Sequence, residues 1–125
     1  MKTVPTVRQR TNLSVRGRGA MLIYEVSGTV DPGLVPEYER YMREQHIPDV
    51  LATGSFIGAT IVKAGENRYR ILYEVADDAT LMRYLDEHAP ALRSDFARHF
   101  PTGVELSRDV WHVLERWPSG EERAG

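Results

Sequence analysis

Hydrophobic and polar positions divide the chain into four strand-like stretches separated by two helical ones. Residues 21–30 begin Met-Leu-Ile-Tyr-Glu-Val, an alternation rich in β-branched and aromatic residues that exposes Glu25. Further strands are predicted at 55–62, 69–75 and 104–115. The turn sequence Ala64-Gly65-Glu66-Asn67 predicts a hairpin between the second strand and the third.

The two helical stretches have clear start and stop signals. Asp31-Pro32-Gly33 predicts a capped start for the first helix. Because Pro48 disfavours a helical conformation for the residue before it, this helix is expected to end or kink near His46. A short piece over 48–52 then ends at Gly54, a C′ glycine. Asp77 and Asp78 cap the second helix, which Pro101-Thr102-Gly103 ends.

This order, β-α-β-β-α-β, predicts an α+β ferredoxin-like fold: a four-stranded antiparallel sheet with two helices on one face. Right-handed crossovers place the first and third strands side by side at the sheet centre, and we expect these two to be parallel. The other sheet face is left open and carries Met21, Ile23, Leu72 and, depending on register, Trp111 or Val113. Because so much apolar surface is unfavourable in water, a face-to-face homodimer is predicted.

Length and charge define one domain with two extensions. Of 125 residues, 21–116 are expected to form the ferredoxin-like domain, 1–20 a disordered basic extension and 117–125 a flexible tail. Residues 1–20 contain five basic residues and no acid, whereas the other 105 contain 11 basic and 18 acidic residues. The acidic body argues against nucleic-acid binding by the folded domain. Met21 opens the first strand and is also a candidate start codon.

Composition excludes several classes of protein. The chain has no cysteine, which excludes disulfides, thiolate metal sites and cysteine nucleophiles. No apolar run approaches the roughly 18 residues of a membrane span. Because the N-terminus also lacks the apolar core of a secretory signal, a cytoplasmic location is expected.

Three of the four histidines precede a proline by two residues, at His46, His88 and His99. At the first, a bend could bring His46 and Asp49 within hydrogen-bonding reach, giving an oriented imidazole for acid/base chemistry. The alternative is a helix corner stabilised by the same contacts. His99 lies where a basic residue and a following proline commonly stop a helix, and no chemistry is assigned to it.

His88 lies on the apolar stripe of the second helix, beside Pro90, which is expected to kink the helix or begin a new segment. Two interpretations stay open. His88 is a core histidine bonded to a freed carbonyl, or it points into a pocket between helix and sheet, with Arg93 available for an anionic group.

Other candidate ligand contacts come from the strands. Glu25 and Glu74 are expected close together on the open face, either as an acid/base pair or in salt bridges with Arg68, Arg70 or His112. Trp111 is a candidate contact on the last strand. Tyr24 and Tyr73 project to the helix-covered face, as core residues whose hydroxyls need partners and as candidate ligand contacts.

Known site motifs are not found. There is no His-Glu-x-x-His, no paired metal-ligand spacing, no glycine-rich phosphate loop and no Gly-x-Ser-x-Gly. No metal and no cofactor are therefore expected.

Three stretches resemble a bacterial family of small uncharacterised proteins classed as a domain of unknown function: Met21–Val26, His46–Gly54 and Tyr84–Arg93. The similarity spans about Met21 to Leu114. The family is similar to the dimeric α/β-barrel, ferredoxin-like superfamily, whose members include cofactor-free monooxygenases, haem-degrading enzymes, polyketide cyclases and small-molecule binders. The resemblance implies a dimer with a cavity between sheet and helices.

The sequence is therefore compatible with two alternative functions. The first is a small-molecule-binding dimer, with His46, Asp49 and His88 in a pocket that supports cofactor-independent acid/base, monooxygenase-like or cyclase-like chemistry. The second is a non-catalytic interaction module whose His-x-Pro motifs are helix corners. A weaker third function has the basic extension recruit RNA or anionic lipid.

Overall fold

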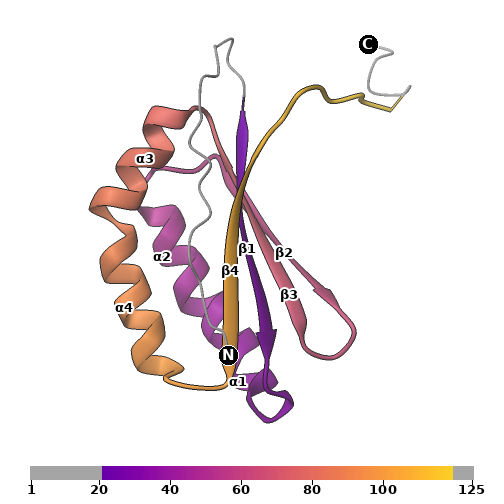
Figure 1. The fold of residues 1–125 in the computed structure, drawn as a ribbon, viewed down its shortest axis with the longest axis vertical. Helices are drawn as coiled ribbons and strands as arrows, with labels where there is room; N and C mark the ends of the chain where they lie inside the picture. The colour runs from indigo at the N-terminus through magenta and orange to yellow at the C-terminus, as the bar shows by residue number, and fades with distance from the viewer. Residues whose placement is uncertain (1–20, 120–125) are drawn as a thin grey trace.

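The computed structural model describes residues 21–119, so the basic extension over 1–20 and the end of the tail lie outside the described residues. The elements follow the predicted order, with each helical stretch divided into shorter segments (Figure 1). In chain order they are β1 (Leu22–Val30), η1 (Pro32–Leu34), α1 (Val35–Tyr41), η2 (Met42–His46), α2 (Ile47–Ala52), β2 (Gly58–Ala64), β3 (Arg68–Val75), α3 (Asp78–Glu87), α4 (Ala89–His99) and β4 (Val104–His112).

The four strands form one antiparallel sheet in the order β2-β3-β1-β4. The central strands β1 and β3 are neighbours, as predicted, but they run antiparallel, so the expectation of a parallel pair was wrong. The helical crossover makes β1 and β2 parallel, and the β2–β3 hairpin then inserts β3 between them in the opposite direction. The predicted α+β ferredoxin-like fold is confirmed.

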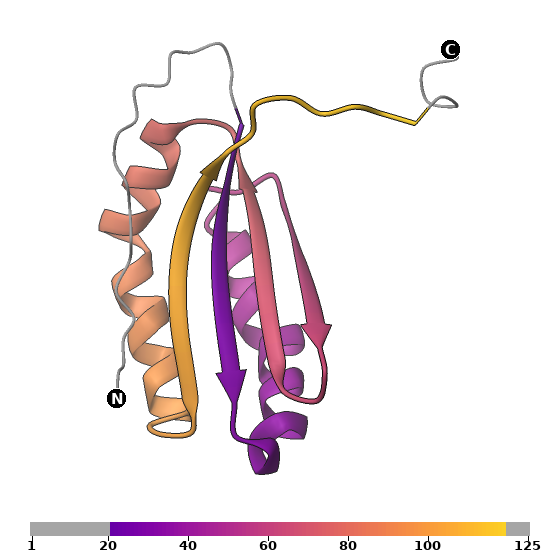
Figure 2. The same ribbon diagram turned by 45° about the vertical axis from the view of Figure 1, so that its right-hand side comes forward.

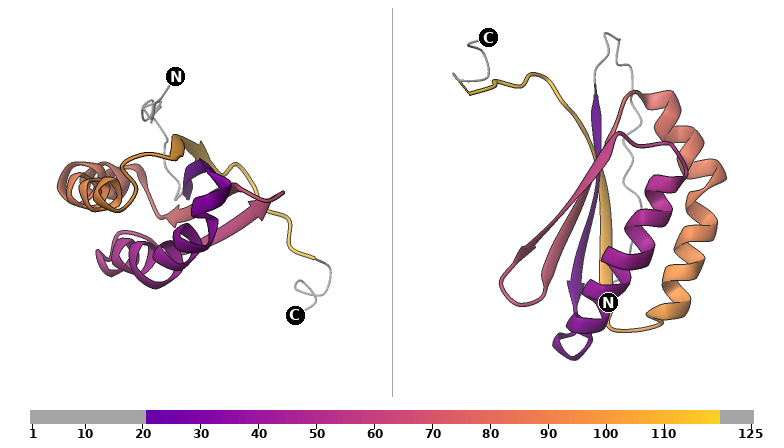
Figure 3. Two further views of the ribbon diagram at one scale, coloured as in Figure 1. Left: turned by 90° about the horizontal axis from the view of Figure 1, so that it is seen from below. Right: turned by 180° about the vertical axis from the view of Figure 1, so that it is seen from behind.

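All the helices cover one face of the sheet (Figures 2 and 3). Alternate residues of β1 and β3 point toward them and are buried, as the strand periodicity requires. Aromatic side chains make up much of this core, including Tyr24, Tyr38, Tyr73, Tyr84 and Phe96. The opposite sheet face has no covering layer within the described residues.

The predicted turn and cap residues behave as expected. The Asp31 carboxylate accepts the backbone N–H of Gly33, and the Asp77 carboxylate accepts that of Thr80. Gly54, which follows the first helical stretch, has a φ of +80°, a conformation that a side chain would strain. These local signals set where the helices begin and end.

The first helical stretch does not stop at His46. The backbone widens into a π-helical turn over Met42–His46, in which the Ile47 N–H donates to the Met42 carbonyl. Pro48 has no N–H, and in a regular helix its ring would collide with the carbonyl of Glu44. The wider turn accommodates the proline, so the helical path continues to Ala52.

The second helical stretch is interrupted just before its proline, in contrast to the first. The helix α3 ends at Glu87, His88 serves as its C-cap, and α4 begins at Ala89 with Pro90 in its first turn. Of the two outcomes that the sequence predicted at Pro90, a kink or a new segment, the structure has the new segment. The third motif also behaves as predicted, because α4 ends at His99.

Candidate small-molecule site between helices and sheet

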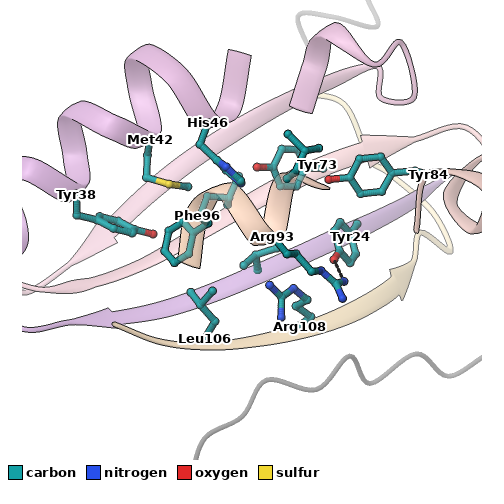
Figure 4. A pocket seen from close by; sticks show the side chains of 13 residues that line it. Tyr24, Tyr38, Met42, His46, Tyr73, Tyr84, Arg93, Phe96, Leu106 and Arg108 are labelled. Atoms are coloured by element: carbon teal, nitrogen blue, oxygen red, sulfur yellow. Dashed lines mark hydrogen bonds between the residues drawn. The ribbon is translucent and has the colours of Figure 1, made fainter. Parts of the chain in front are cut away.

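A cavity of about 40 Å³ lies between the helical layer and the sheet (Figure 4). By volume it has room for two or three water molecules, or for the end of a small organic molecule. Its lining is mostly aromatic and aliphatic, with one histidine and two arginines and no carboxylate. The lining residues are Tyr24, Val26, Tyr38, Met42, His46, Ile71, Tyr73, Tyr84, Leu92, Arg93, Phe96, Leu106 and Arg108.

His46 is placed in this cavity by the π-helical turn that it ends. Its ring lies 5.8 Å from the rings of Tyr41 and Phe96, measured between centroids. Burial lowers the pKa of His46 to about 4, although the charges of Asp49 and Asp95 oppose this effect. The imidazole is therefore neutral at physiological pH, the form that can accept a proton.

Asp49 lies on the solvent-exposed side of the turn that follows. It acts on His46 through its charge, and no hydrogen bond joins the two side chains in the described structure. The predicted His46–Asp49 hydrogen bond is therefore not formed.

Two arginines meet on the other side of the cavity from His46 (Figure 4). Arg93 projects from α4, and its Nη2 donates to the Tyr24 hydroxyl at 3.1 Å. Arg108 pairs with Val26 in the sheet register and so faces the helices. Burial lowers the pKa of Arg108, and the nearby charge of Arg93 acts in the same direction. A guanidinium is too basic to lose its proton, so both groups remain cationic.

The Tyr38 hydroxyl is the other unusual polar group in the cavity wall. The side chain is fully buried, and the oxygen has no hydrogen-bond partner among residues 21–119. Gly28 lies beside this oxygen: a β-carbon there would be in ordinary contact with the hydroxyl, at 3.4 Å, and in tighter contact with Leu106 Cδ2, at 3.2 Å. Burial raises the pKa of Tyr38, so the hydroxyl keeps its proton and remains a hydrogen-bond donor.

His88 does not line the cavity. Its ring stacks on that of Tyr84, which does line the cavity, with centroids 6.2 Å apart. The predicted grouping of His46, Asp49 and His88 is thus not formed, and His46 alone of the three lies at the cavity. Tyr24, Tyr73 and Arg93, which were also predicted, do line it.

Glu25 and Glu74 project from the open sheet face, away from the cavity. The Glu25 side chain is only 6% exposed. It accepts hydrogen bonds from Trp111 Nε1 at 2.5 Å and Ser27 Oγ at 3.0 Å, and Arg70 Nε lies 3.2 Å from it. Glu25 is opposite Leu72 in the register, and Glu74 is opposite Ile23.

These contacts form a salt-bridged network with Arg70, one of the predicted partners. His112 is on the other sheet face, where its Nε2 lies 3.8 Å from the Asp78 carboxylate, so its predicted link to the glutamates is not made.

Arg108, Tyr38 and Tyr84 are cavity residues that the sequence analysis did not select. A signal for Arg108 was available, because it shares its strand parity with Leu106 and Val110, which pack against the core. A charged residue at an inward position of a strand is unusual and points to a partner. Tyr38 and Tyr84 carried no comparable signal, since their spacing is that of ordinary core residues.

Within residues 21–119 there is no group of three or more His, Cys, Asp or Glu side chains placed to hold a metal ion. None of the described helices is long and apolar enough to cross a membrane.

Solved structures share this fold at low sequence identity. A protein of unknown function from Nitrosomonas europaea matches with a TM-score of 0.59 and 19% identity, over 83% of this chain and 100% of that chain. SnoaB, a cofactor-independent oxygenase from Streptomyces nogalater, matches with a TM-score of 0.62 and 13% identity, over 80% and 99%. The haem degrader MhuD from Mycobacterium tuberculosis, with two haems in its active site, matches with a TM-score of 0.57 and 19% identity, over 78% and 99%.

These structural matches support the fold of dimeric α/β-barrel proteins, and a comparison with curated proteins finds no match. A family match covers residues 21–114, from the residue before β1 to just beyond β4. The chain belongs to the family described as a domain of unknown function, DUF4286.

Proposed function

We propose that this protein binds a small organic molecule in the cavity between helices and sheet and performs cofactor-independent acid/base chemistry there. The observation that carries the proposal is the place of His46 in the cavity wall, where its partly buried imidazole is neutral at physiological pH. The cofactor-independent oxygenase among the solved structures of this fold supports the same class of chemistry.

In the proposed step, His46 takes a proton from an acidic O–H or C–H group of the substrate. The electron pair stays on the substrate as an oxyanion or enolate, and the Tyr38 hydroxyl donates a hydrogen bond to that oxygen. A buried donor without a partner among residues 21–119 is suited to this task, because it is already desolvated and free to donate. The negative charge that forms also stabilises the imidazolium, and the proton can return to the product.

Haem degradation is not favoured. A cavity of about 40 Å³ is far smaller than a haem, and its walls are formed by core side chains that pack between helices and sheet.

Turnover tests the role of His46. In a screen of small phenolic and enolisable acids under air, followed by mass spectrometry, we expect His46→Gln to lower the rate about 10²- to 10⁴-fold, the usual contribution of a positioned base. His88→Gln is the matched control and should keep nearly the wild-type rate.

Binding of phenol, followed by NMR, tests the cavity itself. Saturable shifts are expected at the His46 ring and should be weaker in Tyr38→Phe. Equal losses of turnover in the two histidine variants would favour the alternative, an interaction module in which both motifs are helix corners. The position of His88 outside the cavity already favours a structural role for that one motif.

We also propose that the protein is a homodimer formed through the open sheet face. Apolar side chains remain exposed there, with Val62 at 43% and Trp111 at 55% exposure, and the Glu25 network lies among them. One solved structure of this fold, from an uncultured marine organism, is described as a dimeric ferredoxin-like protein. Light scattering is expected to give about 28 kDa, twice the chain mass of 14.2 kDa. A value near 14 kDa at micromolar concentration would contradict the dimer.

A further inference from the structure

The side of the cavity away from His46 has an excess of positive charge. Arg93 and Arg108 both line it, and each is close enough to the other for their charges to interact. None of the lining residues is acidic, and neither arginine forms an ion pair with a described carboxylate. Bringing two cations together in a partly buried site is unfavourable unless an anion compensates them.

Both arginines come from positions that direct their side chains toward the cavity and not toward solvent. Arg108 comes from an inward position of β4, so its side chain cannot reach the open face. Arg93 comes from α4 and is held in the cavity by its bond to the Tyr24 hydroxyl. Tyr24 is also buried, and its ring packs against Phe56, Tyr73 and Tyr84. The two arginines therefore reach the same side of the cavity from two different elements.

We infer that Arg93 and Arg108 bind the carboxylate of the substrate, so that this protein acts on a small organic acid with an apolar or aromatic body. This inference rests on the proposed function and names the substrate class of the same cavity. A planar guanidinium group can donate two parallel hydrogen bonds to the two oxygens of a carboxylate, and its positive charge balances the negative charge of the acid.

The rest of the lining supports an organic acid over inorganic phosphate. Phosphate sites commonly use backbone N–H groups at a glycine-rich loop or helix N-terminus, whereas this cavity is lined by aromatic and aliphatic side chains. A volume of about 40 Å³ accommodates the carboxylate end of a molecule. With the carboxylate at the arginines, the substrate extends toward His46 and Tyr38, which the proposed proton transfer requires.

The test compares benzoate with its neutral counterpart benzamide at constant ionic strength, using NMR shifts of the arginine Nε–H groups and the His46 ring. Benzoate is expected to bind at least tenfold more tightly than benzamide. Arg93→Gln and Arg108→Gln should each weaken benzoate binding by tenfold or more and leave benzamide binding nearly unchanged. Arg40→Gln removes the same charge from an exposed position on α1 and should change neither.

Because Arg108 is largely buried, Arg108→Lys provides a variant that keeps the charge and the fold. It should still prefer benzoate to benzamide, but by a smaller factor, because a lysine lacks the planar fork. Equal affinity for benzoate and benzamide, or unchanged benzoate binding in Arg93→Gln, would overturn the inference, as would tighter binding of inorganic phosphate than of benzoate.

Comparing the binding of phenol with that of benzoate distinguishes a failure of this inference from a failure of the proposed function. If phenol binds beside His46 and benzoate gains nothing from its charge, the cavity remains a small-molecule site and the carboxylate assignment is wrong. If neither phenol nor benzoate binds, both proposals are wrong.

Discussion

The segments around His46 and His88 have the same local sequence, a histidine two residues before a proline near the middle of a helical stretch, yet they adopt different structures. At His46 the helix widens by one π-helical turn and continues, which turns the ring into the core. At His88 the helix ends and a new one begins, and the ring packs on Tyr84 without lining the cavity. A proline thus fixes where a helical backbone hydrogen bond is lost. The packing around it decides whether the helix widens into a π-helical turn or ends.

This difference has a consequence for chemistry. The π-helical turn combines burial with access to a cavity, and these two conditions together produce a neutral, cavity-facing imidazole. π-Helical turns occur often at functional sites for related reasons. The interrupted helix at His88 provides only a cap and a ring contact.

The largest expected effect that separates the two histidines is a pH dependence of stability. The imidazole of His46 has a pKa of about 4 in the folded chain, compared with an ordinary value of 6.5. Between these pH values the unfolded chain binds more protons, so the free energy of unfolding should fall as pH drops from 6.5 to 4 and this contribution should be constant below 4. The difference corresponds to about 3 kcal/mol.

Urea unfolding of His46→Gln and His88→Gln between pH 4 and pH 7.5 measures this contribution against the wild type. His46→Gln should lose it, whereas His88→Gln should keep the wild-type slope. Groups that face His46 and modulate the effect are Asp49, Asp95 and Arg108, and all three are retained in both variants. Identical slopes in the wild type and His46→Gln would show that His46 is not buried as a neutral base.

A smaller effect is expected from the prolines. Pro48→Ala restores an N–H and removes the ring that the π-helical turn accommodates, so a regular α-helical turn becomes available. That change rotates His46 relative to the cavity, and we expect its pKa to rise from about 4 toward 6.5, as followed by NMR of the ring. Pro90→Ala is the matched control and should leave the His46 titration unchanged. A Pro48→Ala variant with an unchanged His46 titration would mean that packing alone maintains the π-helical turn.

Much of the fold was determined by the sequence alone, because its signals are local. Strand alternation, the Asp31 and Asp77 caps, the Gly54 terminus and the Gly65 turn each act over a few residues, and together they specify the order of elements. The role of His99 as a helix stop and the inward side of Tyr24 and Tyr73 also follow from such short-range patterns.

The tertiary structure decided which side chains meet. The antiparallel β1–β3 register placed Glu25 opposite Leu72, and the β4 register turned Arg108 toward the helices and Trp111 toward Glu25. Packing of the helices on the sheet then brought Arg93, Arg108, Tyr38 and His46 around one cavity and left His88 and Asp49 outside it. Several of these outcomes join residues far apart in the sequence, such as Glu25 and Trp111, which are 86 positions apart. No pattern within a single helix or strand records a pairing over that distance.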